Sequence, residues 1–366
     1  MKHLEKHSRQ KELSFTPEDL RWATPEIAAR YRAKRLSAHG KIIADLGCGI
    51  GFQTFAFAEK FEKVYAVEID KEKIERAISN AKALGLKNIQ FIHGDALDQE
   101  IIKQLKDADI IFCDPERLPT EEERTLEKIT PNLHQLIALY SHITQNIAIE
   151  LPPQIKNLAI SGEKEYLSVE GKLNRLTIYC GKLAQAERSA VILSEEARLV
   201  AGAIVEATSK RGARLVAEGN LQAAARLESD KKAKLTFKNE IGKYLYEVDP
   251  AVVKAELVAE LSRITKMSVF SKEKNTYLSS GKKVESPFFT HAFLVLAQGN
   301  FNDKEIISLL KKAEAGKVTL RFPLNPQEYW KIRMRYEKRL SGKKKVSLFK
   351  FGNEAIVGEE LNKQVS

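Results

Sequence analysis

The chain has 366 residues, which is enough for two or three compact domains and too long for one small module. A composition of 43% hydrophobic and 30% charged residues is that of a globular protein and excludes a mostly disordered chain. The net charge of +11 is unevenly distributed, because residues 1–190 contain 28 basic and 28 acidic side chains, whereas residues 191–366 contain 32 and 21. This asymmetry favours an anionic partner, in the first instance nucleic acid, for the C-terminal half.

The three cysteines, Cys48, Cys113 and Cys180, lie far apart in apolar contexts and form no CxxC pair. Their spacing argues against a zinc ribbon or a thioredoxin-type redox site, and no metal site is expected. Buried, reduced cysteines in a cytosolic protein are the simplest interpretation. We expect no signal peptide and no membrane-spanning segment, because no stretch approaches about 18 apolar residues.

Residues 1–40 are expected to be helical, with Thr-Pro-Glu at 16–18 and 24–26 as helix starts. Strands alternating with helices follow, which predicts a parallel sheet covered by helices on both faces, and later strands in close succession predict an antiparallel end. The predicted strands are residues 41–46, 63–69, 89–93, 108–113, 146–150, 157–161, 166–170 and 175–180, and the predicted helices are residues 25–37, 52–61, 71–84, 99–105 and 132–144.

The pattern changes after about residue 190. Residues 194–235 are rich in Ala, Lys, Arg and Glu and are expected to be helical or linking, and a small α/β unit follows them. That unit has predicted helices at 251–266, 303–315 and 326–340 and predicted strands at 288–296 and 318–322. The predicted division is a helical N-terminal extension (1–40), an α/β domain (41–190), a linking helical segment (191–240) and a C-terminal domain (241–366).

The most informative stretch is IIADLGCGIG at residues 42–51. An apolar strand leads to Asp45 and then to alternate glycines, which permit a tight turn and let a ligand approach the backbone closely. Glu68 ends the next predicted strand, where a carboxylate can accept both hydroxyls of a ribose. Asp95 follows the third predicted strand and can accept a hydrogen bond from an adenine amino group.

A loop that binds a nicotinamide dinucleotide is the main alternative, and a tight turn without a ligand is the simplest one. A dinucleotide loop has GxGxxG spacing, which makes room for a pyrophosphate at the helix N-terminus. Here the spacing is GxGxG, and Asp45 lies two residues before Gly47. A carboxylate at that place repels a pyrophosphate but suits the ammonium group of an amino acid. Adenine, ribose and an amino-acid tail without phosphate describe S-adenosylmethionine.

These three motifs, each at a predicted strand end, resemble the class I S-adenosylmethionine-dependent methyltransferases over about residues 20–185, which implies a Rossmann-like α/β fold. The cofactor contacts that this resemblance implies are Asp45, Gly47 and Gly49 at the methionine part, Glu68 at the ribose, and Ile69, Asp95 and Ala96 at the adenine. The triplet Thr24-Pro25-Glu26 matches a stretch that helps to close the cofactor pocket in several RNA guanine-N2 methyltransferases. An ordinary helix cap is an equal alternative for Thr24.

The sequence CDPER at residues 113–117 ends the fourth predicted strand. In related enzymes that methylate exocyclic amines, an acid or amide and a proline carbonyl here accept hydrogen bonds from the NH2 group, and an aromatic ring stacks on the base. This chain keeps Asp114 and Pro115 but has Glu116 for the second proline and Arg117 for the aromatic residue. Arg117 can stack on a base, bind a phosphate or pair with a nearby acid. The predicted catalytic residues are Asp114, Pro115 and Arg117, with a structural strand-end cap as the alternative role for Asp114.

Asp-Pro followed by Arg also occurs in uracil-C5 methyltransferases. Those enzymes need a nucleophilic cysteine soon after the motif. Cys113 lies within a predicted strand and Cys180 lies late in the chain, so neither is placed for that chemistry.

Residues 244–255 resemble a signature of prokaryotic methyltransferases that join a class I domain to a C-terminal THUMP-like domain. THUMP domains accompany tRNA-modifying enzymes, so this resemblance implies an RNA substrate. Residues 301–350 contain 14 basic and 5 acidic residues, and the predicted helix at 326–340 places basic residues beside Tyr329, Trp330 and Tyr336. Such a mixture suits phosphate contact and base stacking, whereas a solvated helix face with aromatic residues packed inward is the alternative.

The sequence therefore predicts a cytosolic, S-adenosylmethionine-dependent RNA methyltransferase that acts on tRNA or rRNA, with guanine N2 as the leading acceptor. Two alternatives stay open. One is a small-molecule methyltransferase with a merely structural C-terminal domain, and the other is a non-catalytic RNA-binding or assembly factor that retains the cofactor fold.

Overall fold

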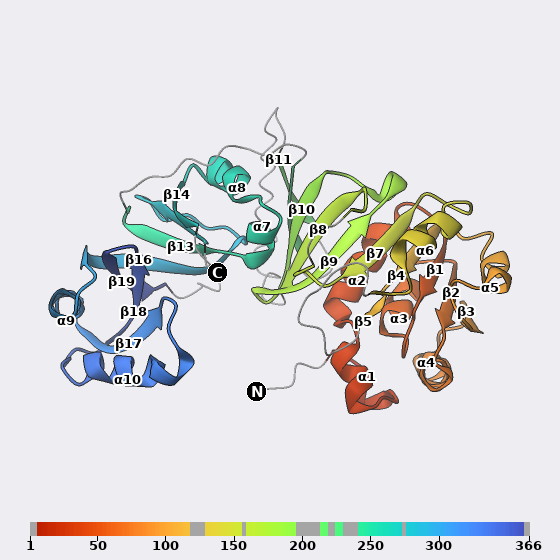
Figure 1. Ribbon diagram of the computed structural model, residues 1–366, viewed down its shortest axis with the longest axis horizontal. Helices are drawn as coiled ribbons and strands as arrows, with labels where there is room; N and C mark the ends of the chain where they lie inside the picture. The colour runs from red at the N-terminus through yellow and green to blue at the C-terminus, as the bar shows by residue number, and fades with distance from the viewer. Residues whose placement is uncertain are drawn as a thin grey trace.

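The computed structural model describes residues 6–117, 129–155, 159–194, 213–218, 224–229, 241–272 and 276–361. Within these ranges the chain forms a ten-stranded sheet, a seven-stranded C-terminal sheet and a short pair of strands, β5 (Glu116–Arg117) and β6 (Ile129–Thr130) (Figure 1). No helix in the described part of the chain is long and apolar enough to cross a membrane.

The ten-stranded sheet begins with five parallel strands in the order β3-β2-β1-β4-β7. They are β1 (Ile42–Leu46), β2 (Lys63–Glu68), β3 (Ile89–His93), β4 (Ile110–Cys113) and β7 (Ile147–Leu151). The sheet continues through β9 (Lys172–Tyr179), which is antiparallel to β7, and then through β8 (Glu163–Val169), β10 (Arg188–Leu193), β12 (Ala224–Ser229) and β11 (Ala213–Glu218). The predicted parallel sheet with an antiparallel end is confirmed.

Successive side chains of the parallel strands enter two different apolar cores, as expected for a sheet buried on both faces. On β4, Phe112 packs in the core beneath α2 and α3, whereas Ile111 and Cys113 pack in the core of the opposite face. The helices of this part are α1 (Pro17–Trp22), α2 (Glu26–Ser37), α3 (Phe52–Ala58), α4 (Lys71–Leu84), α5 (Gln99–Gln104) and α6 (Leu133–Tyr140), with short 3-10 turns at Gln10–Glu12 and Gly181–Leu183. Gly85 ends α4 in the left-handed conformation, as its position predicted.

A buried network of charges fixes α2 to the sheet. Arg35 of α2 pairs with Glu163 of β8 at 2.7 Å and with Glu165, and Arg226 of β12 also pairs with Glu163. Burial alone would raise the pKa of Glu163, but attraction to Arg35 and Arg226 outweighs it, so its pKa lies below the usual value. Ser189 of β10 donates a further hydrogen bond to the same carboxylate. The network therefore joins α2 to three strands of the antiparallel end.

The C-terminal sheet has the strand order β14-β15-β13-β16-β19-β18-β17. Its elements are β13 (Tyr244–Val248), α7 (Pro250–Lys254), α8 (Val258–Thr265), β14 (Ser268–Lys272), β15 (Thr276–Ser280), β16 (Phe289–Asn300), α9 (Asp303–Lys312), β17 (Ala315–Arg321), α10 (Pro326–Glu337), β18 (Lys344–Phe351) and β19 (Glu354–Glu360). The two sheets share one apolar core, in which Ile192 of β10 and Leu227 of β12 pack with Val248 and Val252. Helix α7 contacts β8, β9 and β10, so the segment that resembles the signature lies at the junction.

Three sequence predictions are wrong. The described parts of residues 194–235 are strands β11 and β12, not helix. The alanines and charged residues of this segment suggested helical or linking material. In the structure Arg226 is buried against Glu163, and Leu227 is buried in the shared core. The helix predicted at 251–266 is broken at Glu256, which has a φ of 59°. Of the strand predicted at 157–161, residues 157 and 158 lie outside the described residues, and residues 159–161 form no strand.

The missing strand at 159–161 has a packing explanation, because Ile160 enters the core without pairing with a neighbouring strand. Strands β5, β6, β10, β13, β14, β15, β18 and β19 were not predicted, and the lysines of β18 belong to a basic stretch that was interpreted as suited to phosphate contact. The domain boundaries at residues 40, 190 and 240 stay predictions.

Replacing Glu163 by Gln is expected to lower the free energy of unfolding by about 1.5–3 kcal/mol, because Arg35 and Arg226 lose a charged hydrogen-bond partner and are left with Glu165 and Glu228. Since the pKa of Glu163 is lowered, its stabilisation is present above the usual carboxyl pKa and is lost as the pH falls through the folded-state value. The difference between variant and wild type should therefore shrink in acid. Urea denaturation at several pH values measures both effects.

The matched control is Glu72→Gln, because the Glu72 side chain is 82% exposed and pairs with Arg76 only at the surface of α4. Its effect should stay within about 0.5 kcal/mol. Equal stability of the two variants would contradict the assignment of the Glu163 network as a structural anchor.

Candidate active site

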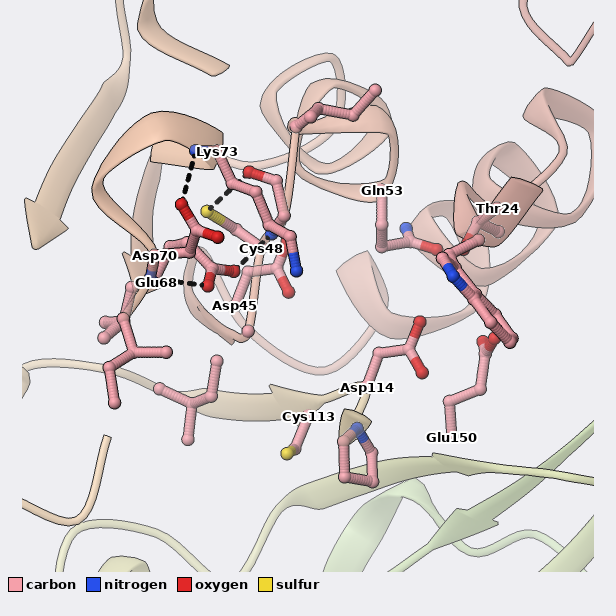
Figure 2. A pocket seen from close by; sticks show the side chains of 18 of the residues that line it. Thr24, Asp45, Cys48, Gln53, Glu68, Asp70, Lys73, Cys113, Asp114 and Glu150 are labelled. Atoms are coloured by element: carbon pink, nitrogen blue, oxygen red, sulfur yellow. Dashed lines mark hydrogen bonds between the residues drawn. The ribbon is translucent and has the colours of Figure 1, made fainter. Parts of the chain in front are cut away.

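A cavity of about 1130 Å³ opens at the carboxyl ends of β1, β2, β4 and β7. Figure 2 shows Glu68, Asp70 and Lys73 at one end of it and Thr24, Gln53, Asp114 and Glu150 at the other. All the described candidate residues line it, namely Thr24, Asp45, Gly47, Gly49, Glu68, Ile69, Asp95, Ala96, Asp114 and Pro115. The backbone of Arg117 lies in β5, but its side chain lies outside what the structure describes. Segments far apart in sequence thus meet in one space.

The glycine loop turns sharply between β1 and α3 because its glycines adopt left-handed conformations. Gly47 has a φ of 80° and Gly51 has a φ of 97°, and residues other than glycine rarely adopt these values. A Cβ atom at Gly51 would lie 2.3 Å from the Phe55 ring, and one at Gly47 would lie 3.2 Å from the carbonyl oxygen of Asp114. The loop therefore passes close to the strand end that carries Asp114.

Asp45 has the properties of a binding site for a cation. It is 1% exposed, and its Oδ2 accepts a hydrogen bond of 2.6 Å from the hydroxyl of Thr54. Its Oδ1 is buried at the cavity and has no hydrogen-bond partner among the described residues. Burial raises the pKa of Asp45 to about 7, against the opposing effects of Thr54 and Arg32. An ammonium group at Oδ1 would satisfy the unpaired oxygen and favour the ionised form.

Glu68 is held in a fixed orientation by two backbone donors. The N–H of Gly49 donates to Oε2 at 2.7 Å, and the N–H of Asp70 donates to Oε1 at 3.0 Å. Each carboxylate oxygen keeps acceptor capacity for a hydroxyl group. Beside Glu68, the apolar side chain of Ile69 is 63% exposed at the cavity, where a flat aromatic ligand could cover it.

The third motif is also fixed by hydrogen bonds. Oδ1 of Asp95 accepts a bond of 2.9 Å from the N–H of Leu97, and the hydroxyl of Tyr140 donates to the carbonyl oxygen of Ala96 at 2.8 Å. Asp95 remains exposed, so its other oxygen can meet a ligand. The residues present therefore fit adenine, ribose and an amino-acid tail.

Asp114 follows β4 and lies half-buried at the opposite end of the cavity. Burial and repulsion from Glu150 raise the pKa of its carboxyl group, whereas attraction to Arg175 and Arg32 lowers it. Glu150, at 1% exposed, bridges the guanidinium groups of Arg32 and Arg175. This arrangement leaves Asp114 poised between its charged and neutral forms.

Sequence reasoning missed the side chains that surround Asp114, namely Arg32, Gln53, Glu150, Asn174 and Arg175. Of these, Gln53, Glu150, Asn174 and Arg175 line the cavity, and Arg32 donates a hydrogen bond to Gln53. They come from α2, α3, β7 and β9 and form no short motif. The available signal was a charged residue inside an apolar pattern, as in the strand Ile147–Leu151.

Thr24 is 4% exposed and lines the cavity. The N-cap of α2 is Pro25, which makes no side-chain capping hydrogen bond, so the alternative role of Thr24 as a helix cap is wrong. The genuine cap lies one helix earlier, where Thr16 and Asp19 form a capping box at the start of α1. The N-terminal extension thus forms part of the cavity wall, with Thr16, Asp19 and Trp22.

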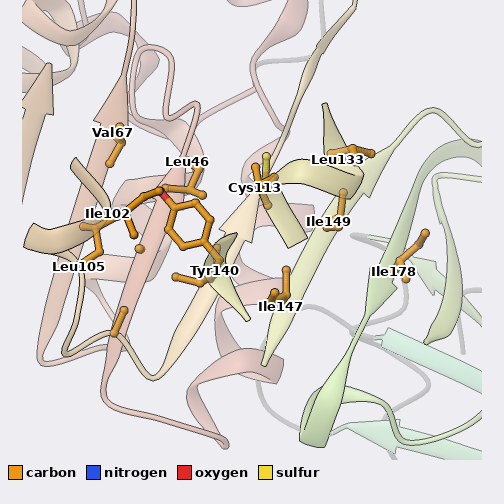
Figure 3. Close-up of a cluster of buried hydrophobic side chains, with 14 of the residues drawn as sticks. Leu46, Val67, Ile102, Leu105, Cys113, Leu133, Tyr140, Ile147, Ile149 and Ile178 are labelled. Carbon is orange, nitrogen blue, oxygen red and sulfur yellow. The ribbon is translucent and has the colours of Figure 1, made fainter. Parts of the chain in front are cut away.

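The three cysteines are free thiols, and burial raises the pKa of each. Cys113 points into the apolar core with Tyr140 and Leu46 (Figure 3). A thiol that stays protonated is a poor nucleophile, which agrees with the exclusion of a uracil-C5 mechanism. No group of three or more metal-binding side chains occurs in the described ranges.

Comparisons with known proteins agree with this geometry. Residues 37–171 match a family model described as a methyltransferase domain. An uncharacterized S-adenosylmethionine-dependent methyltransferase of Mycobacterium tuberculosis is 26% identical over 176 residues, which are 46% of each chain. An uncharacterized RNA methyltransferase of Caldanaerobacter subterraneus is 35% identical over 96 residues, which are 25% of this chain and 21% of that one. The chain thus spans less than half the length of these curated relatives.

A crystal structure assigned to a methyltransferase from Porphyromonas gingivalis W83 has a similar fold along nearly the whole chain. It gives a TM-score of 0.72 at 17% identity and covers 95% of this chain and 83% of that one. The similarity confirms the Rossmann-like α/β fold with its further C-terminal sheet. The family match identifies residues 37–171 as a methyltransferase domain, and the cavity fits S-adenosylmethionine, the cofactor that the name of the mycobacterial relative carries.

Proposed function

We propose that the protein is an S-adenosylmethionine-dependent RNA methyltransferase that acts on tRNA or rRNA, with guanine N2 as the leading acceptor. The observation that carries the proposal is the single cavity that holds three cofactor motifs at one end and Asp114 at the other. Partial relatives named as RNA methyltransferases in Leptospira interrogans and Caldanaerobacter subterraneus support an RNA substrate. A volume of about 1130 Å³ suits a cofactor and a base together.

The cofactor contacts follow from the fixed polar groups. Asp45 receives the ammonium group and Glu68 receives the ribose hydroxyls. Ile69, Asp95 and Ala96 contact the adenine, and Thr24 helps to close the cavity. The bound cofactor supplies an electrophilic methyl group on a positively charged sulfur.

At the acceptor end, the carboxylate of Asp114 and the carbonyl oxygen of Pro115 accept hydrogen bonds from the exocyclic amine. These bonds hold the nitrogen lone pair toward the methyl group, and such alignment supplies much of the rate acceleration. The amine loses a proton when it is methylated. Asp114 can receive that proton, because burial already raises the pKa of its carboxyl group.

Trp22 can replace the aromatic ring that the catalytic loop lacks. It ends α1, lines the same cavity as Asp114 and Pro115, and is 39% exposed. An indole ring stacks well on a base. The ring would hold the base, while Asp114 and the carbonyl oxygen of Pro115 hold its amine. The stacking ring would then come from the N-terminal extension and not from the strand end.

The C-terminal domain, which we propose to be THUMP-like, would bring the RNA through its excess of positive charge. Salt dependence separates this proposal from a small-molecule methyltransferase, because contacts to phosphates weaken steeply as salt rises. A labelled cofactor incubated with total RNA that lacks the modification, followed by nucleoside analysis, identifies the methylated atom. Absence of label in every RNA would favour the non-catalytic alternative.

Replacing Asp45 by Asn is expected to weaken S-adenosylmethionine binding about tenfold to 150-fold, because a hydrogen bond to a charged group contributes about 1.5–3 kcal/mol. Only the ionised carboxylate attracts the ammonium group. Since burial raises the pKa of Asp45 to about 7, wild-type affinity should rise as the pH increases through that value, whereas the variant should show no such rise. Calorimetric titration measures both.

The control for Asp45 is Asp107→Asn, which removes a carboxylate that pairs with Lys63 at the surface. This variant should keep wild-type affinity and pH dependence. An Asp45→Asn variant that binds the cofactor like wild type would remove Asp45 from the binding site.

Replacing Asp114 by Ala is expected to reduce methyl transfer to RNA by roughly 100-fold or more, because the acceptor amine loses its orientation. Cofactor affinity should change little, since Asp114 lies at the other end of the cavity. Asp114→Asn keeps one acceptor oxygen and should retain more activity than Asp114→Ala. If all three proteins transfer methyl groups at the same rate, Asp114 has only the structural role of a strand-end cap.

A further inference from the structure

The most exposed large apolar side chains of the C-terminal domain occur together on α10. Trp330 is 64% exposed and Met334 is 46% exposed, and they lie four residues apart on the same face of the helix. Lys331, next to Trp330, and Lys338, the C-cap residue of α10, are exposed as well. An exposed indole ring and thioether beside positive charge form a surface that a ligand can cover.

Only one aromatic residue of α10 is available for such a ligand. Tyr336 is 2% exposed in the core of the C-terminal domain, and Tyr329 packs against the same core. For these two residues the expectation of inward packing is therefore right. Trp330 is exposed, so the aromatic surface of α10 is a single ring.

The Trp330 ring is held in place by its neighbours. The guanidinium group of Arg333 lies 5.1 Å from the ring centroid, and the Tyr329 ring meets it edge-on at 5.7 Å. Arg333 is itself fixed by Glu337 at 2.8 Å, and Glu337 accepts a hydrogen bond from the N–H of Val318 in β17. A ring fixed before binding loses little conformational entropy on binding.

The surrounding charges favour a polyanion. Along α10 the acids are Glu328, which is exposed, and Glu337, which is neutralised by Arg333. Arg335 pairs with Asp303 at 2.8 Å, so the exposed basic residues left near Trp330 are Lys331 on the helix and Lys338 and Arg339 just beyond it. In Figure 1, α10 and α1 both lie along the lower side of the molecule, and α1 borders the cavity.

We propose that α10 is an RNA anchor in which an unpaired base stacks on Trp330 and the adjoining phosphates contact Lys331 and Lys338. The anchor lies outside the cavity and gives affinity without a base code, because every base has a face that can stack. This inference rests on the proposed RNA methyltransferase function, and its test separates the two.

The chain has two tryptophans, Trp22 and Trp330, so Trp330 is the sole indole fluorophore in a Trp22→Phe variant. Titration of that variant with an unstructured oligouridylate, and separately with total tRNA, should quench Trp330 fluorescence as a base stacks on the ring. Trp330→Ala in the full-length protein should weaken RNA binding about tenfold or more. Trp330→Phe, which keeps a ring, should retain most of the affinity.

The two lysines give an independent measurement. The affinity for RNA falls as the salt concentration rises, so a plot of log affinity against log salt has a negative slope. Changing Lys331 and Lys338 together to Ala should make that slope shallower by about 1.4, because each phosphate that is no longer neutralised reduces its magnitude by about 0.7. Trp330→Ala should leave that slope unchanged, because it removes no charge. Ile78→Ala is the matched control, since Ile78 is 47% exposed on α4 and lies outside the cavity lining.

Three outcomes would overturn the anchor alone. Trp330→Ala could bind RNA as tightly as wild type, the Trp330 emission could stay constant on RNA addition, or the substitution could alter only self-association in sedimentation. In the first two cases, continued methyl transfer by the wild type would leave the proposed function intact. If the wild-type protein binds no RNA at all, the proposed RNA substrate fails together with the anchor.

Discussion

The buried bridge of Glu150 between Arg32 and Arg175 holds the acceptor end of the cavity together. Arg32 comes from α2, Glu150 from β7 and Arg175 from β9, and the Arg32 guanidinium group also lies 4.9 Å from the Phe112 ring of β4. Two positive groups compensate one negative group, so the bridge leaves a net positive field beside Asp114. Arg32 and Arg175 lower the pKa of Asp114, and Arg32 lowers the pKa of Asp45, so without these arginines burial would drive both carboxyl groups further toward the neutral form.

A second set of buried charges extends the same principle along α2. Arg35 pairs with Glu163 and Glu165 one turn after Arg32, and the hydroxyl of Tyr31 donates to Glu165 at 2.8 Å. Buried ion pairs contribute little net stability compared with apolar packing, but removing one partner of such a pair strongly destabilises the folded protein. The two sets thus fix the register of the N-terminal extension on the sheet. Because α1 and Thr24 form the cavity wall, this register also determines the shape of the cavity.

The parallel half of the fold could be predicted from the sequence because each strand is an apolar run followed by a glycine, an acid or a helix start. For the same reason the motif residues Asp45, Glu68, Asp95 and Asp114 were found. Strands β11 and β12 were missed because their alanines and charged residues suggested helical or linking material, and only tertiary pairing shows that Arg226 is buried.

The other residues of the site had no comparable signal. Gln53, Glu150 and Arg175 reach the cavity from three elements whose proximity depends on the sheet order. Trp22 belongs to a short helix whose position depends on the capping box at Thr16 and on contacts with the α/β domain. Chemistry of this kind becomes visible only when the strands are placed side by side.

The apolar core shared by the two sheets has a consequence for substrate choice. Since Ile192 and Leu227 are buried against Val248 and Val252, movement of the C-terminal sheet away from β10 and β12 would expose apolar surface to water. The separation between α10 and Asp114 is therefore a property of the fold and not of a linker. If the proposed anchor holds an RNA at α10, that RNA can present only a nucleotide at this separation to Asp114, so the target would be selected by its distance from the anchored base.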